Sequence, residues 1–163
     1  MIEYDTPDII RDIWNKLPDE ELYYDEESPD DYGIEKMTHV TLVPCMDNDT
    51  DIGLLKKYLR PLYEYSLLLT NVSAFTNNSD YDVLKCDVAS DILTQTNSRI
   101  CGDFPTHTEY TEYHPHMTVA YMKKGMTGKY HKDIVIPLVI LKPKCFVFSN
   151  YSDDGQYQVV RFT

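Results

Sequence analysis

The sequence predicts an α+β domain built around largely antiparallel sheet. Two observations favour this class. Short runs rich in β-branched and aromatic residues are interleaved with about three segments of helical periodicity. Several of these runs are joined by polar turns, which are typical of strands that pair with their neighbours in the chain. A length of 163 residues corresponds to about one domain with a proper hydrophobic core.

The first part of the chain predicts two helices and one strand. Apolar residues at helical spacing follow Thr6, and Pro7 suits the first helical turn. A second apolar stripe follows Asp49 and Thr50, either of which can cap a helix, and Pro61 kinks or ends that helix. The predicted order is a helix over 7–18, an acidic loop, a strand over 38–44 and a helix over 51–65.

The remainder of the chain reads mainly as strands. The polar segment TNNSD separates two β-rich runs, and SDDG separates the last two, so each pair forms a hairpin. The predicted elements are strands over 66–75 and 81–88, a helix over 90–100, and strands over 116–122, 134–141, 145–149 and 156–162.

The charge divides the chain at residue 35. The formal charge is −12, and residues 1–35 hold 13 acidic and two basic side chains, a net of −11. The other 128 residues are close to neutral. We therefore predict an acidic helix and loop over 1–35, a possible lid, and a catalytic domain over 36–163. The excess of acid disfavours binding to long nucleic acids and to anionic membranes, since both need clustered Lys and Arg.

Composition indicates in which cellular compartment the protein is expected. No apolar run approaches the roughly 18 residues that span a bilayer. The first ten residues lack the basic and apolar regions of a signal peptide. Four widely spaced cysteines without a C-x-x-C pair indicate free thiols in a reducing compartment. We therefore expect a cytoplasmic protein.

One short pattern occurs twice. His39-Val-Thr41 is repeated by His116-Met-Thr118, 77 residues further along (116 − 39). In a strand, alternate residues share a face, so each copy presents an imidazole and a hydroxyl together above an apolar pair. If the two strands lie in one sheet, two histidines and two threonines converge.

That set of side chains suits phosphodiester cleavage without a metal. One histidine acts as general base and the other as general acid, and both roles are accessible near neutral pH. The Thr41 and Thr118 hydroxyls can hydrogen-bond the non-bridging phosphate oxygens. Which histidine takes which role stays open at this point. The competing interpretation is that His39 and His116 are partly buried strand histidines bonded to nearby threonines.

The paired segments THVTLVP and HPHMTVAYM resemble the two signature motifs of the 2H phosphoesterase superfamily, the LigT-like fold. The resemblance covers roughly 33–162 and implies a bilobal, pseudo-symmetric fold with a central cleft. Residues 113–130 further resemble bacteriophage anti-CBASS nucleases, which implies metal-free degradation of cyclic oligonucleotide immune signals. The chain departs from many phage members at Val43-Pro44-Cys45, where a Tyr-Gly pair is usual.

Other residues are candidates for binding the substrate. Lys123 and Lys124 follow the second motif and can attract phosphates, although ordinary solvated lysines are an equally good interpretation. Tyr4 and Tyr151 can stack on bases from segments expected to be flexible. A zinc site from His107, Glu109, Glu112, His114 and His116 is disfavoured, because that loop is polar throughout. We expect no metal and no cofactor.

The sequence therefore predicts a phosphodiesterase for small cyclic oligonucleotides. The alternatives are a 2′-5′ oligonucleotide or 2′,3′-cyclic phosphodiesterase, and a protein that sequesters cyclic nucleotides without cleaving them. A further option is that the acidic segment mimics DNA and binds a basic protein. The partner expected is a small cyclic or linear oligonucleotide, and the oligomeric state is not predicted.

Overall fold

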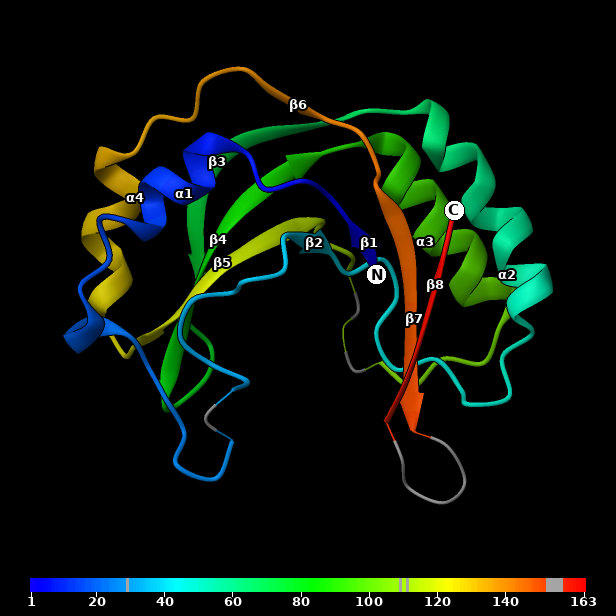
Figure 1. Ribbon diagram of the computed structural model, residues 1–163, viewed down its shortest axis with the longest axis horizontal. Helices are drawn as coiled ribbons and strands as arrows, with labels where there is room; N and C mark the ends of the chain where they lie inside the picture. Colours follow the sequence, from blue (N-terminus) through cyan, green and yellow to red (C-terminus); the bar gives the residue numbers. More distant parts are fainter. Residues whose placement is uncertain (29, 109, 111, 152–156) are drawn as a thin grey trace.

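A computed structural model describes residues 1–28, 30–108, 110, 112–151 and 157–163, with backbone only at 133, 150–151 and 157–158. In this part of the chain the strands form two four-stranded sheets in which every pairing is antiparallel. Helices and short 3-10 turns flank the sheets (Figure 1). The predicted α+β class with antiparallel sheets is confirmed.

The first sheet joins distant parts of the chain. Its order is β2-β1-β7-β8. The strands are β1 (Ile2–Glu3), β2 (His39–Val40), β7 (Cys145–Tyr151) and β8 (Tyr157–Phe162). β1 lies between β2 and β7, where Glu3 is opposite both His39 and Cys145. β7 and β8 form the predicted hairpin.

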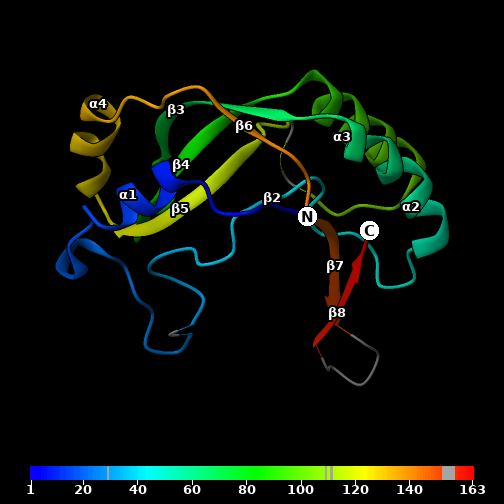
Figure 2. The same cartoon turned by 45° about the horizontal axis from the view of Figure 1, so that its top comes forward.

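The second sheet is built from longer strands. Its order is β5-β4-β3-β6. The strands are β3 (Leu67–Phe75), β4 (Tyr81–Ala89), β5 (His116–Lys123) and β6 (Val139–Leu141). β2 and β5, each at the end of its own sheet, contact each other at the centre of the molecule. The views in Figures 1 and 2 both show these two strands side by side.

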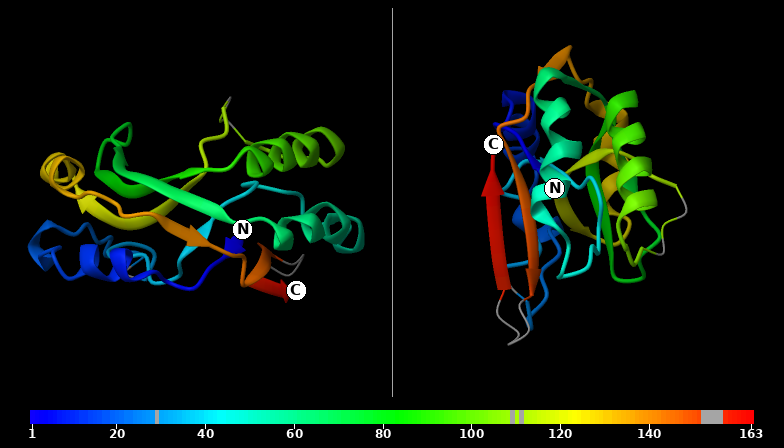
Figure 3. Two further views of the ribbon diagram at one scale, coloured as in Figure 1. Left: turned by 90° about the horizontal axis from the view of Figure 1, so that it is seen from above. Right: turned by 90° about the vertical axis from the view of Figure 1, so that its right-hand side faces the viewer.

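Two pairs of helices lie at opposite ends of the molecule (Figure 3). α1 (Asp8–Trp14) and α4 (Tyr130–Asp133) occupy one end, and α2 (Ile52–Leu59) and α3 (Asp91–Asp103) the other. The 3-10 turns are η1 (Asp19–Glu21), η2 (Arg60–Glu64) and η3 (Met126–Lys129). None of the helices in the described ranges has the length and apolar character needed to cross a membrane.

Helix capping follows the sequence closely. The Asp51 carboxylate accepts from the Leu54 amide at 3.0 Å and caps α2, so the cap lies directly after the two candidates considered, Asp49 and Thr50. The Ser90 hydroxyl accepts from the Leu93 amide at 3.4 Å and caps α3. α2 ends as predicted near Pro61, which lies in the first turn of η2.

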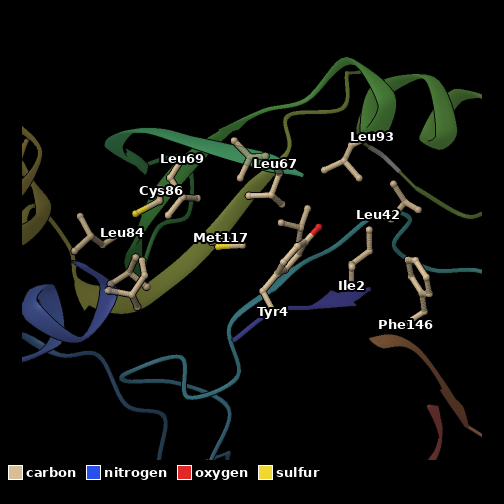
Figure 4. Packing of buried hydrophobic residues seen from close by; sticks show 14 of the residues in the cluster. Ile2, Tyr4, Leu42, Leu67, Leu69, Leu84, Cys86, Leu93, Met117 and Phe146 are labelled. Carbon is tan, nitrogen blue, oxygen red and sulfur yellow. The ribbon is translucent and has the colours of Figure 1, made fainter. Parts of the chain in front are cut away.

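Alternation along the central strands separates a core face from an open face. On β5, Met117 and Val119 are fully buried, whereas His116 and Thr118 are half-buried. Met117 packs in one hydrophobic cluster with Leu84 of β4 and Ile2 of β1 (Figure 4).

Two predictions differ from the structure. The strand expected over 38–44 is paired only at His39–Val40, because the chain bends at 42–45 and Cys45 has a φ of 52°. The strand expected over 134–141 is paired only at Val139–Leu141, where it adds to β3 after Pro137. Since a proline cannot donate to a strand ladder, pairing begins beyond it.

The acidic segment 1–35 is packed into the same core as the rest of the chain. It supplies β1 and α1, and its Ile2, Ile13 and Leu22 are almost completely buried. Leu22 and Ile34 form isolated bridges with β5. The boundary at residue 35 is therefore one of charge, and hydrophobic packing continues across it.

Candidate active site

The two predicted histidines lie on neighbouring strands at the centre of the molecule. His39 is the first residue of β2 and His116 the first residue of β5. Both side chains are half-buried. The charge on His39 is close enough to His116 to lower its pKa. The structure therefore brings together the two imidazoles that the repeated motif singled out.

Both imidazoles are held in the same way. Nδ1 of His39 lies 2.7 Å from the carbonyl oxygen of Met37, and Nδ1 of His116 lies 2.7 Å from that of His114. A carbonyl only accepts hydrogen bonds, so in each ring Nδ1 carries the proton. The neutral ring then has its lone pair on Nε2. In each neutral ring, Nε2 is thus the nitrogen that can accept a proton.

The two motif threonines are placed differently. Thr118 lies inside β5, on the same face as His116 and half-buried. Thr41 follows directly after β2, and its carbonyl oxygen accepts a hydrogen bond of 3.2 Å from the Tyr113 hydroxyl. Tyr113 comes from the segment before β5, so it ties the first motif to the second.

Each motif is also anchored by a side chain from a helix, at equivalent positions. The Trp14 indole of α1 donates to the carbonyl oxygen of Val119 at 3.0 Å. The Asn97 amide of α3 donates to the carbonyl oxygen of Leu42 at 2.8 Å. Both carbonyls belong to the third residue after the motif histidine. These bonds fix the backbone on which the histidines and threonines are carried.

An ion pair between a buried lysine and a partly exposed aspartate lies beside the second motif. The Lys85 ammonium bonds the Asp87 carboxylate and the Ser73 hydroxyl, the latter at 2.7 Å. The same ammonium lies 4.4 Å from the centre of the Phe75 ring. The edge of that ring packs against the His116 imidazole, with 4.8 Å between ring centres. Sequence reasoning singled out neither Lys85 nor Asp87, although a lysine inside an apolar strand was a visible signal.

A more exposed cluster of charge lies beside the first motif. Glu3 is opposite His39 on β1. Its carboxylate pairs with Lys144 at 2.9 Å and with Arg161 at 3.5 Å. The Lys144 side chain is 53% exposed, compared with 8% for Lys85. Hydrogen bonding to Lys144 is the main reason why the pKa of Glu3 is lowered.

The surroundings of His116 favour its neutral form. Burial lowers the pKa of His116 most, and the charges of Lys85 and His39 lower it further. The hydrogen bond to His114 and the charge of Asp87 act in the opposite direction but are outweighed. A histidine whose pKa lies below its usual range is mostly neutral at neutral pH and can accept a proton.

Comparison with protein families agrees with this geometry. A family model described as the 2′-5′ RNA ligase superfamily matches residues 10–130, which contain both motifs. This chain belongs to the 2′-5′ RNA ligase superfamily. The predicted membership of the LigT-like 2H phosphoesterases is thereby confirmed, and it indicates a phosphodiesterase of the 2H type. No curated protein gives a significant match to the chain.

In this superfamily member, Lys124 has a structural role. Its ammonium donates to the carbonyl oxygens of Thr76 and Asn78, each at 2.6 Å, and lies 3.0 Å from the buried Asp82 carboxylate. These bonds fasten the turn after β5 to the β3–β4 hairpin. Lys123 is exposed at the last position of β5, up to about 23 Å along the strand from His116. Neither lysine is brought to the histidines, and substrate binding by them stays a prediction.

The two predicted tyrosines also lie apart from the motifs. Tyr4 is only 3% exposed, because it continues the inward face of β1 and packs in the core (Figure 4). Its expected place in a flexible segment is therefore corrected, and its ring cannot stack on a base without leaving the core. Tyr151 ends β7 opposite Tyr157, and its side chain lies outside the described residues.

Four other tyrosines form a cluster on the open face of the second sheet. Tyr81 and Tyr121 are on β4 and β5, and Tyr23 and Tyr32 come from the acidic segment. Their ring centres lie 5.0 to 5.6 Å apart in the contacting pairs. The register places Tyr121 opposite Val83, two residues from Lys85, so the cluster shares the face that carries His116. Composition showed many tyrosines but not which ones gather.

The first motif of this superfamily member adjoins a cavity of about 180 Å³. Thr41 is part of the lining, which is otherwise mostly apolar and comes from α2, α3, β7 and the loop after β2. The second motif faces the charged cluster described above. The two halves of the site therefore differ in polarity.

The histidines weighed earlier for zinc have other partners in this superfamily member. Nε2 of His107 lies 2.7 Å from the Asp47 carboxylate, and Nε2 of His114 lies 3.4 Å from that of Glu112. Glu109 lies outside the described residues. Among the residues whose placement is described, no three His, Cys, Asp or Glu side chains are grouped as metal ligands would be.

Proposed function

We propose that the chain is a phosphodiesterase that cleaves small cyclic oligonucleotides without a metal. His39 and His116 carry out acid–base catalysis, and the hydroxyls of Thr41 and Thr118 hold the phosphate. The base removes a proton from the attacking water or neighbouring 2′-hydroxyl. The bond between phosphorus and the leaving oxygen then breaks, and the acid protonates that oxygen.

One observation carries the proposal. Both motif histidines have Nδ1 fixed on a backbone carbonyl two residues earlier, each at 2.7 Å. Each ring is thereby held as the tautomer whose Nε2 can accept or return a proton. A single histidine held in this way is common, but two on adjacent strands provide the paired acid and base that phosphodiester cleavage requires.

The environment of His116 supports an assignment of the two roles. We propose His116 as the general base, because burial and the charges of Lys85 and His39 lower its pKa and keep it neutral. His39 is then the general acid. The strand register places it opposite Glu3 of β1.

Two features support a small nucleotide as the substrate. The tyrosine cluster formed by Tyr23, Tyr32, Tyr81 and Tyr121 offers aromatic rings for bases, on the face that carries His116. The resemblance of residues 113–130 to anti-CBASS nucleases favours the cyclic signals of bacterial immunity. Under this proposal the protein acts in bacteriophage counter-defence.

A substrate panel tests the proposal. Purified protein is incubated with cyclic dinucleotides, cyclic trinucleotides, 2′-5′ oligoadenylate and 2′,3′-cyclic nucleotides, with and without EDTA, and the products are separated by chromatography. We expect cleavage of a cyclic oligonucleotide that persists in EDTA and is lost in the His116→Ala variant. Intact ligand retained in a one-to-one complex would instead favour the sequestering protein.

The second candidate is a phosphodiesterase for 2′-5′-linked oligonucleotides or 2′,3′-cyclic phosphates. The description of the matching family, the 2′-5′ RNA ligase superfamily, favours it. The same panel separates the two candidates. Turnover of 2′-5′ oligoadenylate or a 2′,3′-cyclic nucleotide, with cyclic oligonucleotides left intact, would replace the first proposal by the second.

A further inference from the structure

Lys85 is an unusual side chain for the interior of a sheet. It lies in the middle of β4, and only 8% of its side chain is exposed. Burying an ammonium is costly unless its charge and all its hydrogen bonds are matched. Here the Asp87 carboxylate, the Ser73 hydroxyl and the Phe75 ring match it. Such an arrangement calls for a reason beyond stability, since apolar residues fill such positions at lower cost.

The strand register aligns this ion pair with the second motif. Lys85 is directly opposite Thr118, and Asp87 is directly opposite His116. The alignment depends on an irregularity, because Leu84 faces Ala120 and Val119 is an extra residue on β5. Bulges of this kind re-aim side chains and are frequent beside active sites. Along the backbone, Lys85 is thus aligned with the threonine and Asp87 with the histidine, while the ammonium reaches towards Asp87 and the Phe75 ring.

The pair is held rigidly in that direction. The Ser73 hydroxyl accepts from Lys85 and donates to Asp87 at 2.7 Å. The Asn71 amide donates to the other carboxylate oxygen at 2.5 Å. Although burial opposes it, hydrogen bonds from Lys85 and Ser73 lower the pKa of Asp87, so the carboxylate stays charged. A fixed dipole therefore runs along β4 under the motif.

Each end of this dipole complements one step of the proposed reaction. A phosphate held at Thr118 lies on the strand next to Lys85, whose ammonium attracts its negative oxygens. The proton that His116 takes up is attracted by the carboxylate of Asp87, the residue paired with His116 on that neighbouring strand. In agreement, Lys85 lowers the pKa of His116 and Asp87 raises it, while His39 on β2 is the other facing group that lowers it.

We propose that Lys85 and Asp87 are positioning residues of the active site. Lys85 draws the phosphodiester of the substrate to Thr118, and Asp87 orients and balances His116. This inference rests on the proposed phosphodiesterase function, but it makes a separate claim about anion binding. A pair that only joined β3 to β4 would affect stability and would be indifferent to an anion.

Binding of inorganic phosphate tests the Lys85 end without any turnover. The protein is labelled with ¹⁵N, and the Thr118 amide and His116 ring signals are followed during a phosphate titration. Lys85→Met is expected to weaken phosphate binding about tenfold, the size of one lost charge-assisted contact. Lys57→Met, an exposed lysine of α2, is the matched control and leaves binding unchanged. If phosphate does not move the Thr118 signal of the unmodified protein, the proposal is overturned.

Titration of the His116 ring tests the Asp87 end. Lys85→Met removes a charge that lowers the pKa of His116 and is expected to raise it. Asp87→Asn removes a charge that raises this pKa and is expected to lower it. Opposite shifts are the signature of a dipole acting on the ring, and shifts in the same direction would overturn the inference. If Lys85→Met does not fold, Lys85→Gln keeps a donor for Ser73 and Asp87.

Kinetics complete the test with whichever phosphodiester the panel identifies. Lys85→Met is expected to raise KM about tenfold. The pH at which the reaction rate falls on the acidic side reports the pKa of His116, the proposed base. This pH should rise in Lys85→Met and fall in Asp87→Asn. An unchanged KM overturns the Lys85 role. If no substrate is cleaved, the proposed function fails, while the phosphate and ring titrations still decide this inference.

Discussion

The two H-x-T motifs are alike in chemistry and unlike in support. The second lies on β5, an eight-residue strand whose partner β4 places the buried Lys85 and its partner Asp87 beside it. The first lies on β2, which is paired over only two residues and whose neighbouring cations are exposed. The histidine bonds are the same length in both. The difference indicates that the second motif is the more firmly preorganised half of the candidate site.

The largest effects are expected from the histidines themselves. His39→Ala and His116→Ala should each lower turnover by roughly 10²- to 10⁴-fold, the usual contribution of a positioned acid or base. Because the two act as a unit, the double variant should be little worse than either single one. Steady-state kinetics with a cleaved substrate measures this.

His131→Ala is the matched control, since His131 lies exposed on α4. It should leave turnover unchanged. Near-full activity in either motif variant would remove that histidine from the mechanism and leave the comparison of the two motifs without its chemical basis.

The threonines are expected to show the difference between the motifs. Thr118→Val should lower kcat/KM by about 10- to 100-fold, because it removes a hydrogen bond to developing charge inside a preorganised strand. Thr41→Val should cost less, because Thr41 lies just outside β2. Thr118→Ser and Thr41→Ser keep the hydroxyl and should recover most activity. Equal losses at both positions would contradict the inferred asymmetry.

The helix anchors test whether both motifs need the same backbone support. Asn97→Ala removes the side-chain donor to the Leu42 carbonyl, whereas Trp14→Phe removes one of two donors to the Val119 carbonyl, which keeps the Glu35 amide at 3.1 Å. We expect Asn97→Ala to lower the free energy of unfolding by about 1–3 kcal/mol and Trp14→Phe to lower it by about 0.5–1.5 kcal/mol. Chemical denaturation measures this, with Gln95→Ala on the exposed face of α3 as the control. A loss confined to Trp14→Phe would show that only the second motif depends on its anchor.

The smallest effect is the electrostatic coupling between the motifs. His39→Gln removes a positive charge that lowers the pKa of His116, so this pKa should rise. The direction in which activity changes with pH follows from the role of His116 as a base. His116 acts as a base only above its pKa, so activity is present at neutral pH and falls as the pH drops through that value.

A ring titration of His116 by NMR, in the unmodified protein and in His39→Gln, measures this shift. Burial remains in the variant, so the pKa should still lie below the usual value of about 6.5 for histidine. A pKa above that value in the unmodified protein would exchange the roles of base and acid.

The local sequence pattern was sufficient to predict which motif residues share a face of their strand. His116 and Thr118 on one side of a strand, with Met117 and Val119 on the other, follow from alternation alone, and the burial agrees. The H-x-T repeat was enough to predict the family that the comparison confirms. These features depend only on neighbours in the sequence.

What the pattern missed depends on distant partners. Ile2–Glu3 is too short to show alternation, and it becomes a strand only because β2 and β7 lie on either side of it. For the same reason Tyr4 was expected in a flexible segment and is found in the core. The Lys85–Asp87 pair faces the second motif through a bulge in the β4–β5 ladder, and such a register cannot be derived from either strand alone.

The position of β1 has a consequence for the order of folding. Glu3 is bonded to Cys145, 142 residues away along the chain, and it stands opposite His39 in the same sheet. Pairings of such long range form late, because a long loop must close before they contribute. The second motif, built on the adjacent strands β4 and β5, needs no such closure. During synthesis the half that carries the second motif can therefore be assembled before β7 is made and closes the first sheet, so that under the proposed function a partly made chain holds the phosphate-binding residues before the acid–base pair is complete.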